Sequence, residues 1–304
     1  MATIIIILLS IAAIAILRQE RLNHNKNEIQ HHYLQVLLVG NTQSERYIEE
    51  LSTLSGNKNR QAAAEVVAEL SHIIYKLDQH TLENITQSLH LTDFLLSQTK
   101  RSRGAERTKY LSIFSRIPLS PFDLKQLAPY THAKDRMDRF YALMAIINAD
   151  QKNIMYHIAR YPAPMTPFEI SQLISLLRLG SIAVAYQPML QSESLNLNLL
   201  GVAIVQYFGI ESAEHELRKI IDTHTDYSLR REALYALASM QLLLCSPSIC
   251  QFLRKMPRID AQRFLRHIAS EGYAQNTINF FVGQHERKYF HSLINSYKIK
   301  IECL

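Results

Sequence analysis

A pattern that recurs about every 30 residues constrains the fold of this chain more than any other sequence feature. Windows of twelve residues share apolar side chains at their sixth and ninth positions. Six of them begin at Glu106, Asp138, Phe168, Leu197, Leu229 and Asp260, so that successive starts are 32, 30, 29, 32 and 31 residues apart. Positions three apart lie on one face of a helix. A fixed period of this length is typical of repeat proteins, in which each unit packs on its neighbours.

A second helical stretch follows each of the first five windows after a short breaker. These stretches cover residues 120–128, 151–160, 182–190, 212–221 and 247–255. Residues 60–98 predict an earlier helix pair, whose second member opens at Thr81 or Leu82. The chain has only 8 Gly and 9 Pro, about half of what average usage gives, and no stretch shows a sustained period of two. Together these features exclude a β-rich fold.

The pattern predicts an all-α chain built as an α-solenoid of tandem antiparallel helix pairs. A compact helical bundle has the same periodic apolar faces and remains the alternative. The unit Asp226–Met240, DYSLRREALYALASM, resembles a HEAT repeat, because Arg230 follows the Asp by four residues and an Ala- and Leu-rich helix follows both. Asp135 and Arg139 repeat this relationship. The resemblance implies that these polar residues tie neighbouring units together.

The resemblance covers about residues 60–282 and is closer in architecture than in detail. The units are near 31 residues long, shorter than the common HEAT length of about 40, and the windows at Phe168 and Leu197 lack the Arg. The Trp, Gly and Tyr pattern of tetratricopeptide repeats is missing, which disfavours that family.

The segment from Ala2 to Leu17 holds no charge and is followed at once by Arg18 and Arg21. As a helix it spans roughly 24 Å, slightly less than the hydrocarbon core of about 30 Å, and snorkelling arginines close such a gap. Because the positive charges follow the segment, we expect a single-pass anchor with the bulk of the chain in the cytoplasm. A cleaved signal at Ala13–Ala15, leaving a secreted or periplasmic protein, and a buried or interfacial helix remain alternatives.

Four parts follow from these patterns: a transmembrane anchor over 1–18, a helical neck over 19–58, a HEAT-like α-solenoid over 59–283 and a basic C-terminal tail over 284–304. The chain has 33 basic and 27 acidic side chains, a formal charge of +6. Residues 254–300 hold 9 of the basic and 3 of the acidic ones, an excess equal to that of the whole chain.

No motif of catalysis, cofactor binding or metal binding occurs in the sequence. His285 lacks the second His of a zinc-binding helix, and Cys245 and Cys250 are too far apart for the usual zinc spacing. The eight glycines are scattered, so no phosphate-binding loop exists, and no Ser lies in a nucleophile elbow. We therefore predict no catalytic residue, no cofactor and no metal.

Two basic clusters form the candidate binding surface. They contain Arg101, Arg103, Arg107, Arg254, Lys255, Arg258, Arg263 and Arg266. Such clusters suit an acidic protein, anionic lipid headgroups or a nucleic acid, and a solvated surface without a ligand is the alternative. Nucleic acid is disfavoured because aromatic side chains are not interleaved with the charges and an anchored chain is remote from chromosomal DNA. We expect Arg107, with Arg139 and Arg230, to be structural.

The sequence predicts a non-catalytic, membrane-anchored scaffold or adaptor whose helical-repeat surface binds another protein, with a membrane enzyme as one candidate partner. The binding surface is expected to follow the polar positions of the first helix of each pair, and no small-molecule substrate is indicated. The alternative is an enzyme or lyase-like chaperone in a solenoid groove, similar to HEAT-like bilin lyases or DNA glycosylases. An enzyme should have a deep pocket where Asp, Glu, Tyr or His side chains converge, whereas a scaffold should have a shallow groove.

Overall fold

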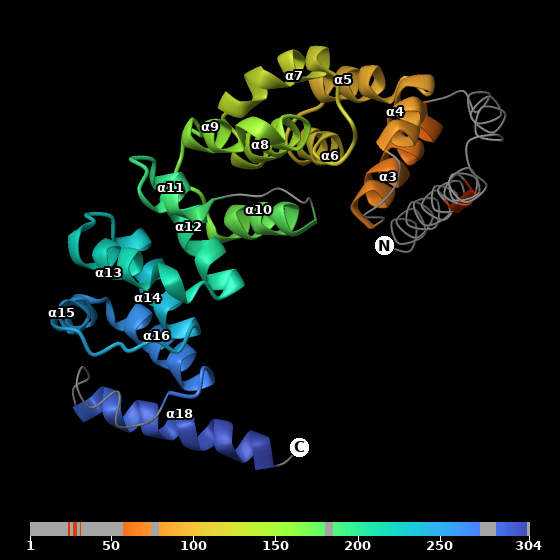
Figure 1. The fold of residues 1–304 in the computed structure, drawn as a ribbon. Coiled ribbons are helices and arrows are strands. Elements are labelled where there is room, and N and C mark those ends of the chain that lie inside the picture. The colour runs from red at the N-terminus through yellow and green to blue at the C-terminus, as the bar shows by residue number, and fades with distance from the viewer. Residues whose placement is uncertain are drawn as a thin grey trace, which may run out of the picture. The chain divides into compact units, whose positions relative to one another are not determined.

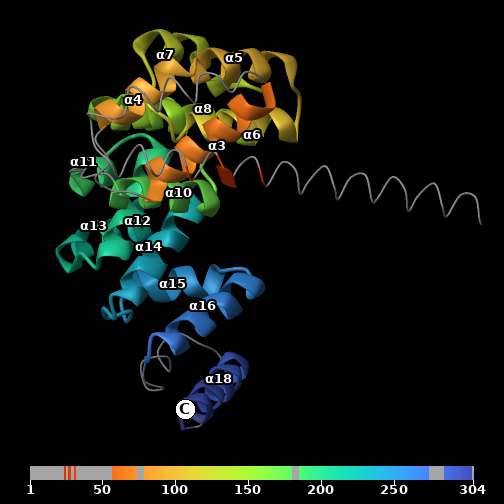
Figure 2. The same cartoon turned by 90° about the vertical axis from the view of Figure 1, so that its right-hand side faces the viewer.

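A computed structural model describes residues 57–73, 79–179, 185–273 and 284–302, together with His24, Asn27, Glu28 and His31. Every regular element in these residues is a helix and none is a strand, which confirms the all-α fold (Figures 1 and 2). The expected anchor, Ala2 to Leu17, and nearly all of the expected neck lie outside the described residues. Among the helices that the structure describes, none is both long and apolar enough to cross a membrane.

The six windows each coincide with a helix, called here a first helix. These are α6 (Ala105–Phe114), α8 (Arg136–Ala149), α10 (Pro167–Leu179), α12 (Leu195–Phe208), α14 (Tyr227–Ser239) and α16 (Arg258–Ser270). The five expected second helices are α7 (Pro121–Leu127), α9 (Ile154–Ala159), α11 (Tyr186–Leu190), α13 (Glu214–Thr223) and α15 (Pro247–Lys255). Short 3₁₀ turns accompany three of them, over Ala128–His132, Gln151–Asn153 and Glu211–Ala213. The sequence period therefore marks real helix pairs.

In the described residues four more helices flank these pairs. They are α3 (Asn57–Ile73), α4 (Gln79–Ser88) and α5 (Leu91–Arg101) before α6, and α18 (Gln284–Glu302) after α16. The last of these occupies the segment expected as a basic tail. Phe290 of α18 is buried, and the Tyr289 hydroxyl accepts a hydrogen bond from Arg266 Nε at 2.6 Å. These contacts make α18 part of the packed structure.

The helices divide into two compact units. The first unit comprises residues 1–162 with 179–181, and the second comprises residues 163–178 with 182–304. The apolar core of the first unit gathers around α3, α5, α6 and α8, with Phe114 and Phe140 fully buried. In the second unit α12 packs on α14 and α14 packs on α16.

Polar side chains cap the N-termini of several helices, at the short breaks between one helix and the next. The Ser120 and Asp123 side chains form a reciprocal capping box at the start of α7. Asp135 accepts hydrogen bonds from two backbone N–H groups of α8, and Asp226 accepts one from Leu229 in α14. The two Asp residues of the HEAT-like pattern are thus N-caps, which satisfy backbone donors that the first turn of a helix leaves without partners.

The arginines of the same pattern link chain segments. Arg230 Nε donates to the Ile221 carbonyl of α13 at 2.7 Å, and its guanidinium lies 4.4 Å from the ring centre of Phe252 in α15. Arg139 donates to the Ala133 carbonyl at 2.7 Å, and Arg107 donates to the Ser102 carbonyl at 2.7 Å. These contacts give all three arginines a structural role, as expected from the sequence.

Hydrogen bonds between successive repeats have the same spacing as the sequence pattern. The donor and acceptor are 30 to 33 residues apart in Thr108 to Asp138 (2.7 Å), Asn196 to Ala163 (3.0 Å), Gln206 to Ser239 (3.0 Å) and Tyr227 to Asp260 (2.8 Å). Each pair joins one repeat to the next. The period thus reflects stacking as well as helix length.

Two residues of α12 allow α11 to approach closely. A Cβ at Gly201 would lie 3.0 Å from Met189 Cβ and from Leu190 Cδ2, so a larger residue would require the two helices to separate. Asn198 is buried, and its amide donates to the carbonyls of Met189, Leu190 and Ser192 at 2.9 to 3.2 Å. These carbonyls lie at the end of α11 and just after it, where a helix leaves backbone acceptors without partners in the helix.

A candidate binding groove on three first helices

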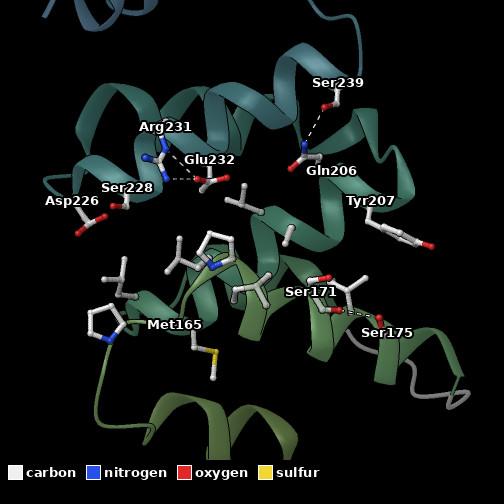
Figure 3. Close-up of a pocket in the computed structure, with 18 of the residues that line it drawn as sticks. Met165, Ser171, Ser175, Gln206, Tyr207, Asp226, Ser228, Arg231, Glu232 and Ser239 are labelled. Atoms are coloured by element: carbon white, nitrogen blue, oxygen red, sulfur yellow. Dashed lines mark hydrogen bonds and ion pairs between the residues drawn. The ribbon is translucent and has the colours of Figure 1, made fainter. Parts of the chain in front are cut away.

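A hollow of about 740 Å³ in the second unit lies across α10, α12 and α14, and we call it the first-helix groove (Figure 3). Its volume falls in the range of about 300–1,000 Å³ that is usual for ligand sites. All of its lining residues belong to these three helices or to the turns that precede α10 and α14.

The groove is lined by the same window positions on successive helices. The third, seventh and eleventh positions supply Ile170, Ile174 and Arg178 of α10, Leu199, Ala203 and Tyr207 of α12, and Arg231 and Ser239 of α14. Positions four apart share one side of a helix. The ninth positions of α12 and α14, Val205 and Leu237, are buried in the core, and Leu176 at the ninth position of α10 is half-buried. One helix face therefore packs while a neighbouring face lines the groove.

The part of the groove formed by α10 and α12 is largely apolar, with Arg178 and neutral polar side chains at its edges. Ile170, Ile174 and Leu199 supply aliphatic surface. The exposed Ser175 hydroxyl donates to the Ser171 carbonyl at 3.0 Å within α10, so its hydrogen bond is already made. This part suits an apolar ligand surface.

An exposed aromatic pair marks one edge of the groove. Tyr207 and Phe208 are 52% and 54% exposed, and their rings meet edge to face with centres 5.0 Å apart. Tyr207 also lines the groove. Exposed aromatic side chains are enriched where proteins bind one another, because they supply large contact area at a small cost in conformational entropy.

The charged groups of α14 are paired with each other. Arg231 Nη2 donates to Glu232 Oε1 at 2.7 Å, and Arg231 Nη1 lies 3.9 Å from Asp260 Oδ2 of α16. The Tyr227 hydroxyl donates to the same Asp260 oxygen at 2.8 Å. Burial, and then the hydrogen bond to Asp260, raises the pKa of Tyr227 well above its usual 10.0. The carboxylates of this network are engaged by donors, so they are poorly placed to exchange protons with a substrate.

A further polar chain links α12, α14 and α16. Gln206 Nε2 donates to Ser239 Oγ at 3.0 Å, and Ser239 Oγ lies 3.1 Å from His267 Nε2. His267 Nδ1 lies 3.8 Å from Glu271 Oε1. The order hydroxyl, imidazole, carboxylate matches an activated serine in outline. The last distance, however, exceeds that of a hydrogen bond, so the carboxylate does not hold the imidazole in a catalytic orientation.

The predicted basic residues are divided between the two units. Arg101 and Arg103 of the first unit are exposed, while Arg107 is half-buried, with its guanidinium Nη1 3.8 Å from Asp138 Oδ2. The remaining five are exposed in the second unit: Arg254, Lys255, Arg258, Arg263 and Arg266. Three of the eight residues thus belong to the first unit and five to the second, which also holds the groove.

The apolar residues of the groove were missed by the sequence reasoning, which looked for polar positions on the first helices. Ile170 and Leu199 occupy the third position of their windows, and Ile174 occupies the seventh. The sixth and ninth positions of the same windows are also apolar. A helix with apolar residues on more than one face is usually buried. In α10 and α12 the additional apolar face lines a groove. The unusually wide apolar surface of these two helices was therefore the sequence feature that could have indicated the groove.

Comparisons with known proteins give no family: no protein-family model matches this chain, and neither does any curated protein. Among the described residues, no group of three or more His, Cys, Asp or Glu side chains is placed to hold a metal ion.

Proposed function

We propose that the chain is a membrane-anchored scaffold whose HEAT-like solenoid binds a segment of a partner protein in the first-helix groove. The anchor is the apolar segment Ala2 to Leu17, and the body lies in the cytoplasm. The observation that carries the proposal is the groove itself, because three successive first helices contribute the same window positions to one continuous hollow. Repeat proteins commonly bind their partners on such extended surfaces.

The shape and chemistry of the groove favour a peptide segment as the ligand. Neighbouring helices pack about 9 Å apart, so a surface that crosses α10, α12 and α14 is roughly 18 Å long, the length of about 12 helical residues. Its apolar part suits the apolar face of an amphipathic helix. Several of its polar groups are held by hydrogen bonds and ion pairs inside the second unit, as at Arg231 with Glu232 and Gln206 with Ser239.

Site-specific photocrosslinking in membranes tests the proposal. A benzophenone amino acid replaces Tyr207 at the groove edge or, as a matched control, Tyr156 of the first unit, which is 56% exposed against 52% for Tyr207. We expect position 207 to give a defined crosslink to one protein that position 156 does not give. Equal crosslinking at both positions would contradict the proposal.

A blocking variant provides the second arm of the test. Ser175 is exposed inside the groove, so Ser175→Trp fills the hollow without disturbing the core. Ser292→Trp on α18 is the control, because Ser292 is also an exposed helical Ser bonded to its own helix. We expect only Ser175→Trp to abolish the crosslink from position 207. A crosslink that survives this substitution would place the partner elsewhere.

A second candidate function, acyl transfer, rests on the contact between Ser239 Oγ and His267 Nε2 at 3.1 Å. In that case a fluorophosphonate probe should label wild-type protein at Ser239 and should not label Ser239→Ala. Labelling that depends on both Ser239 and His267 would favour the enzyme over the scaffold. Equal labelling of wild type and Ser239→Ala would exclude Ser239 as the nucleophile.

A further inference from the structure

The helix face that lines the groove continues onto α16 and changes its chemistry there. The third, fourth and seventh window positions are Ile170, Ser171 and Ile174 in α10, Leu199, Leu200 and Ala203 in α12, Arg231, Glu232 and Tyr235 in α14, and Gln262, Arg263 and Arg266 in α16. At these positions the face is largely apolar on the first two helices, although Leu200 is fully buried and Arg178, at the eleventh position of α10, adds a positive charge to the groove. It carries a charge pair on the third helix and is basic on the fourth.

Helix α16 packs directly beside the α14 wall of the groove. The rings of Tyr235 and Phe264 meet at 5.2 Å between centres, and Ser239 Oγ lies 3.1 Å from His267 Nε2. The Tyr227 hydroxyl bonds Asp260 at the start of α16. The basic positions of α16 therefore extend the groove face by one more helix.

The positive charge on α16 is incompletely neutralised within the second unit. Arg263 is 69% exposed, and Asp260 Oδ1, 3.8 Å away, is a shared partner because the same carboxylate accepts from Tyr227 and lies near Arg231. Arg266 is exposed and bonds the neutral hydroxyl of Tyr289. Residues 254–266 hold five basic side chains and one acidic one. An acidic ligand group would find two oriented guanidinium groups here.

We infer that the first-helix groove takes a segment with two chemically different parts, an apolar part on α10 and α12 and an acidic part on Arg263 and Arg266. This inference rests on the proposed function and adds to it the charge, order and orientation of the bound segment. Because α12 and α16 are two helix spacings apart, the apolar and acidic parts lie roughly 18 Å from each other, which is about 12 residues of helix.

A partner protein fits this face better than an anionic membrane surface. Lipid headgroups would meet the five exposed basic residues of α15 and α16 alike, including Arg254 and Lys255, which are outside the groove face. A bilayer surface does not reach into the hollow between α10 and α12, where the apolar residues lie. A segment of chain can contact both the hollow and the arginines.

Fluorescence anisotropy with the full-length protein in nanodiscs tests the inference. The probes are two synthetic amphipathic peptides of about 20 residues, long enough to cross four helices, each with leucines at helical spacing in one half. One carries four glutamates in the other half and its counterpart carries four lysines. We expect the glutamate peptide to bind at least about tenfold more tightly at low salt, with a difference that shrinks as salt screens the charges.

Charge reversal separates the inference from the proposed function. The double variant Arg263→Glu with Arg266→Glu should reverse the preference in favour of the lysine peptide. The control Lys125→Glu with Lys152→Glu changes the net charge equally at two exposed residues of the first unit and should leave the preference unchanged. If Ser175→Trp blocks both peptides but the two bind equally well to wild type, the inference fails and the groove stands.

Two other outcomes would contradict the groove as the binding site or the role of the two arginines. If Ser175→Trp weakens neither peptide, the groove is not the binding site, and the proposed function fails with the inference. Vesicles of phosphatidylcholine with about a quarter phosphatidylserine test whether the arginines bind anionic lipid instead. The nanodiscs that hold the protein and the free vesicles have the same lipid composition. If Arg263→Glu with Arg266→Glu abolishes vesicle binding and leaves both peptide affinities unchanged, the arginines bind lipid and the inference is overturned.

Discussion

The two units of the molecule use the same helix positions in different ways. In the first unit, the third and seventh window positions of α8 are Phe140 and Met144, both buried in the packed structure. The fourth position of α6 is Lys109, whose Nζ lies 2.6 Å from Glu65 Oε1. In the second unit Ile170, Ile174 and Leu199 at the corresponding positions of α10 and α12 are also mostly buried, 6 to 9% exposed, but they border the first-helix groove. The same window positions thus pack in both units, and in the second unit they also line a hollow.

The largest expected effect tests the packed side of this comparison. Phe140→Ala removes a fully buried ring at the third position of α8 and should lower the free energy of unfolding of the first unit by about 3–5 kcal/mol. Guanidinium unfolding followed by circular dichroism, fitted with separate transitions where the two units unfold apart, measures the change. Phe140→Leu keeps most of the volume and should cost less than about 1.5 kcal/mol. A loss below about 1 kcal/mol for Phe140→Ala would show that this position is not part of the core.

The next largest effect concerns how the second unit holds α11 against the groove helix α12. Asn198→Ala leaves the carbonyls of Met189, Leu190 and Ser192 without their side-chain donor, and we expect a loss of about 2–3 kcal/mol. Peptide binding should weaken along with the loss of structure, because α12 forms the centre of the groove. The measurement is the same unfolding experiment, with Asn148→Ala on α8 as the control. Comparable losses for the two variants would mean that the three hydrogen bonds add little.

The sequence allowed the helices to be predicted better than the groove. The sixth window positions are all buried and the ninth positions are buried or half-buried, so their period located all six first helices. At the end of the chain a basic tail was expected, but the structure has the packed helix α18. This helix is held by burial of Phe290 and by the hydrogen bond between Tyr289 and Arg266, and charge composition indicates neither contact. Whether Ile174 faces the core or a hollow depends on which neighbours approach it. That is a property of tertiary packing, so residue identity alone did not reveal it.

A smaller effect should appear in alkaline solution and should affect the second unit. Burial raises the pKa of Tyr235 to about 12 and that of Tyr273 to about 12, against 10.0 for a free side chain. Because the folded pKa is higher than the unfolded one, their contribution to stability is complete below pH 10 and is lost as the pH rises from 10 through 12. Absorbance at 295 nm should show these two tyrosines ionising after the exposed ones. In Tyr273→Phe, which also loses the hydrogen bond to the Leu242 carbonyl, the late step should shrink and stability should fall by about 1 kcal/mol.

The smallest expected effect lies in acid and affects the first unit. The hydrogen bond from His157 Nε2 at 2.8 Å, and then that from Asn153, lowers the pKa of Asp150 below its usual 3.8. A lowered folded pKa means that the stabilisation is complete above about pH 4 and is lost as the pH falls through the folded value. The side chain of Asp150 is 30% exposed, so solvent screens the interaction and keeps the effect small. Thermal unfolding of wild type and Asp150→Asn should therefore differ at pH 6 and converge towards pH 3. A difference that grows in acid would show that Asp150 destabilises the fold, and would place the acid sensitivity of the first unit in other carboxylates.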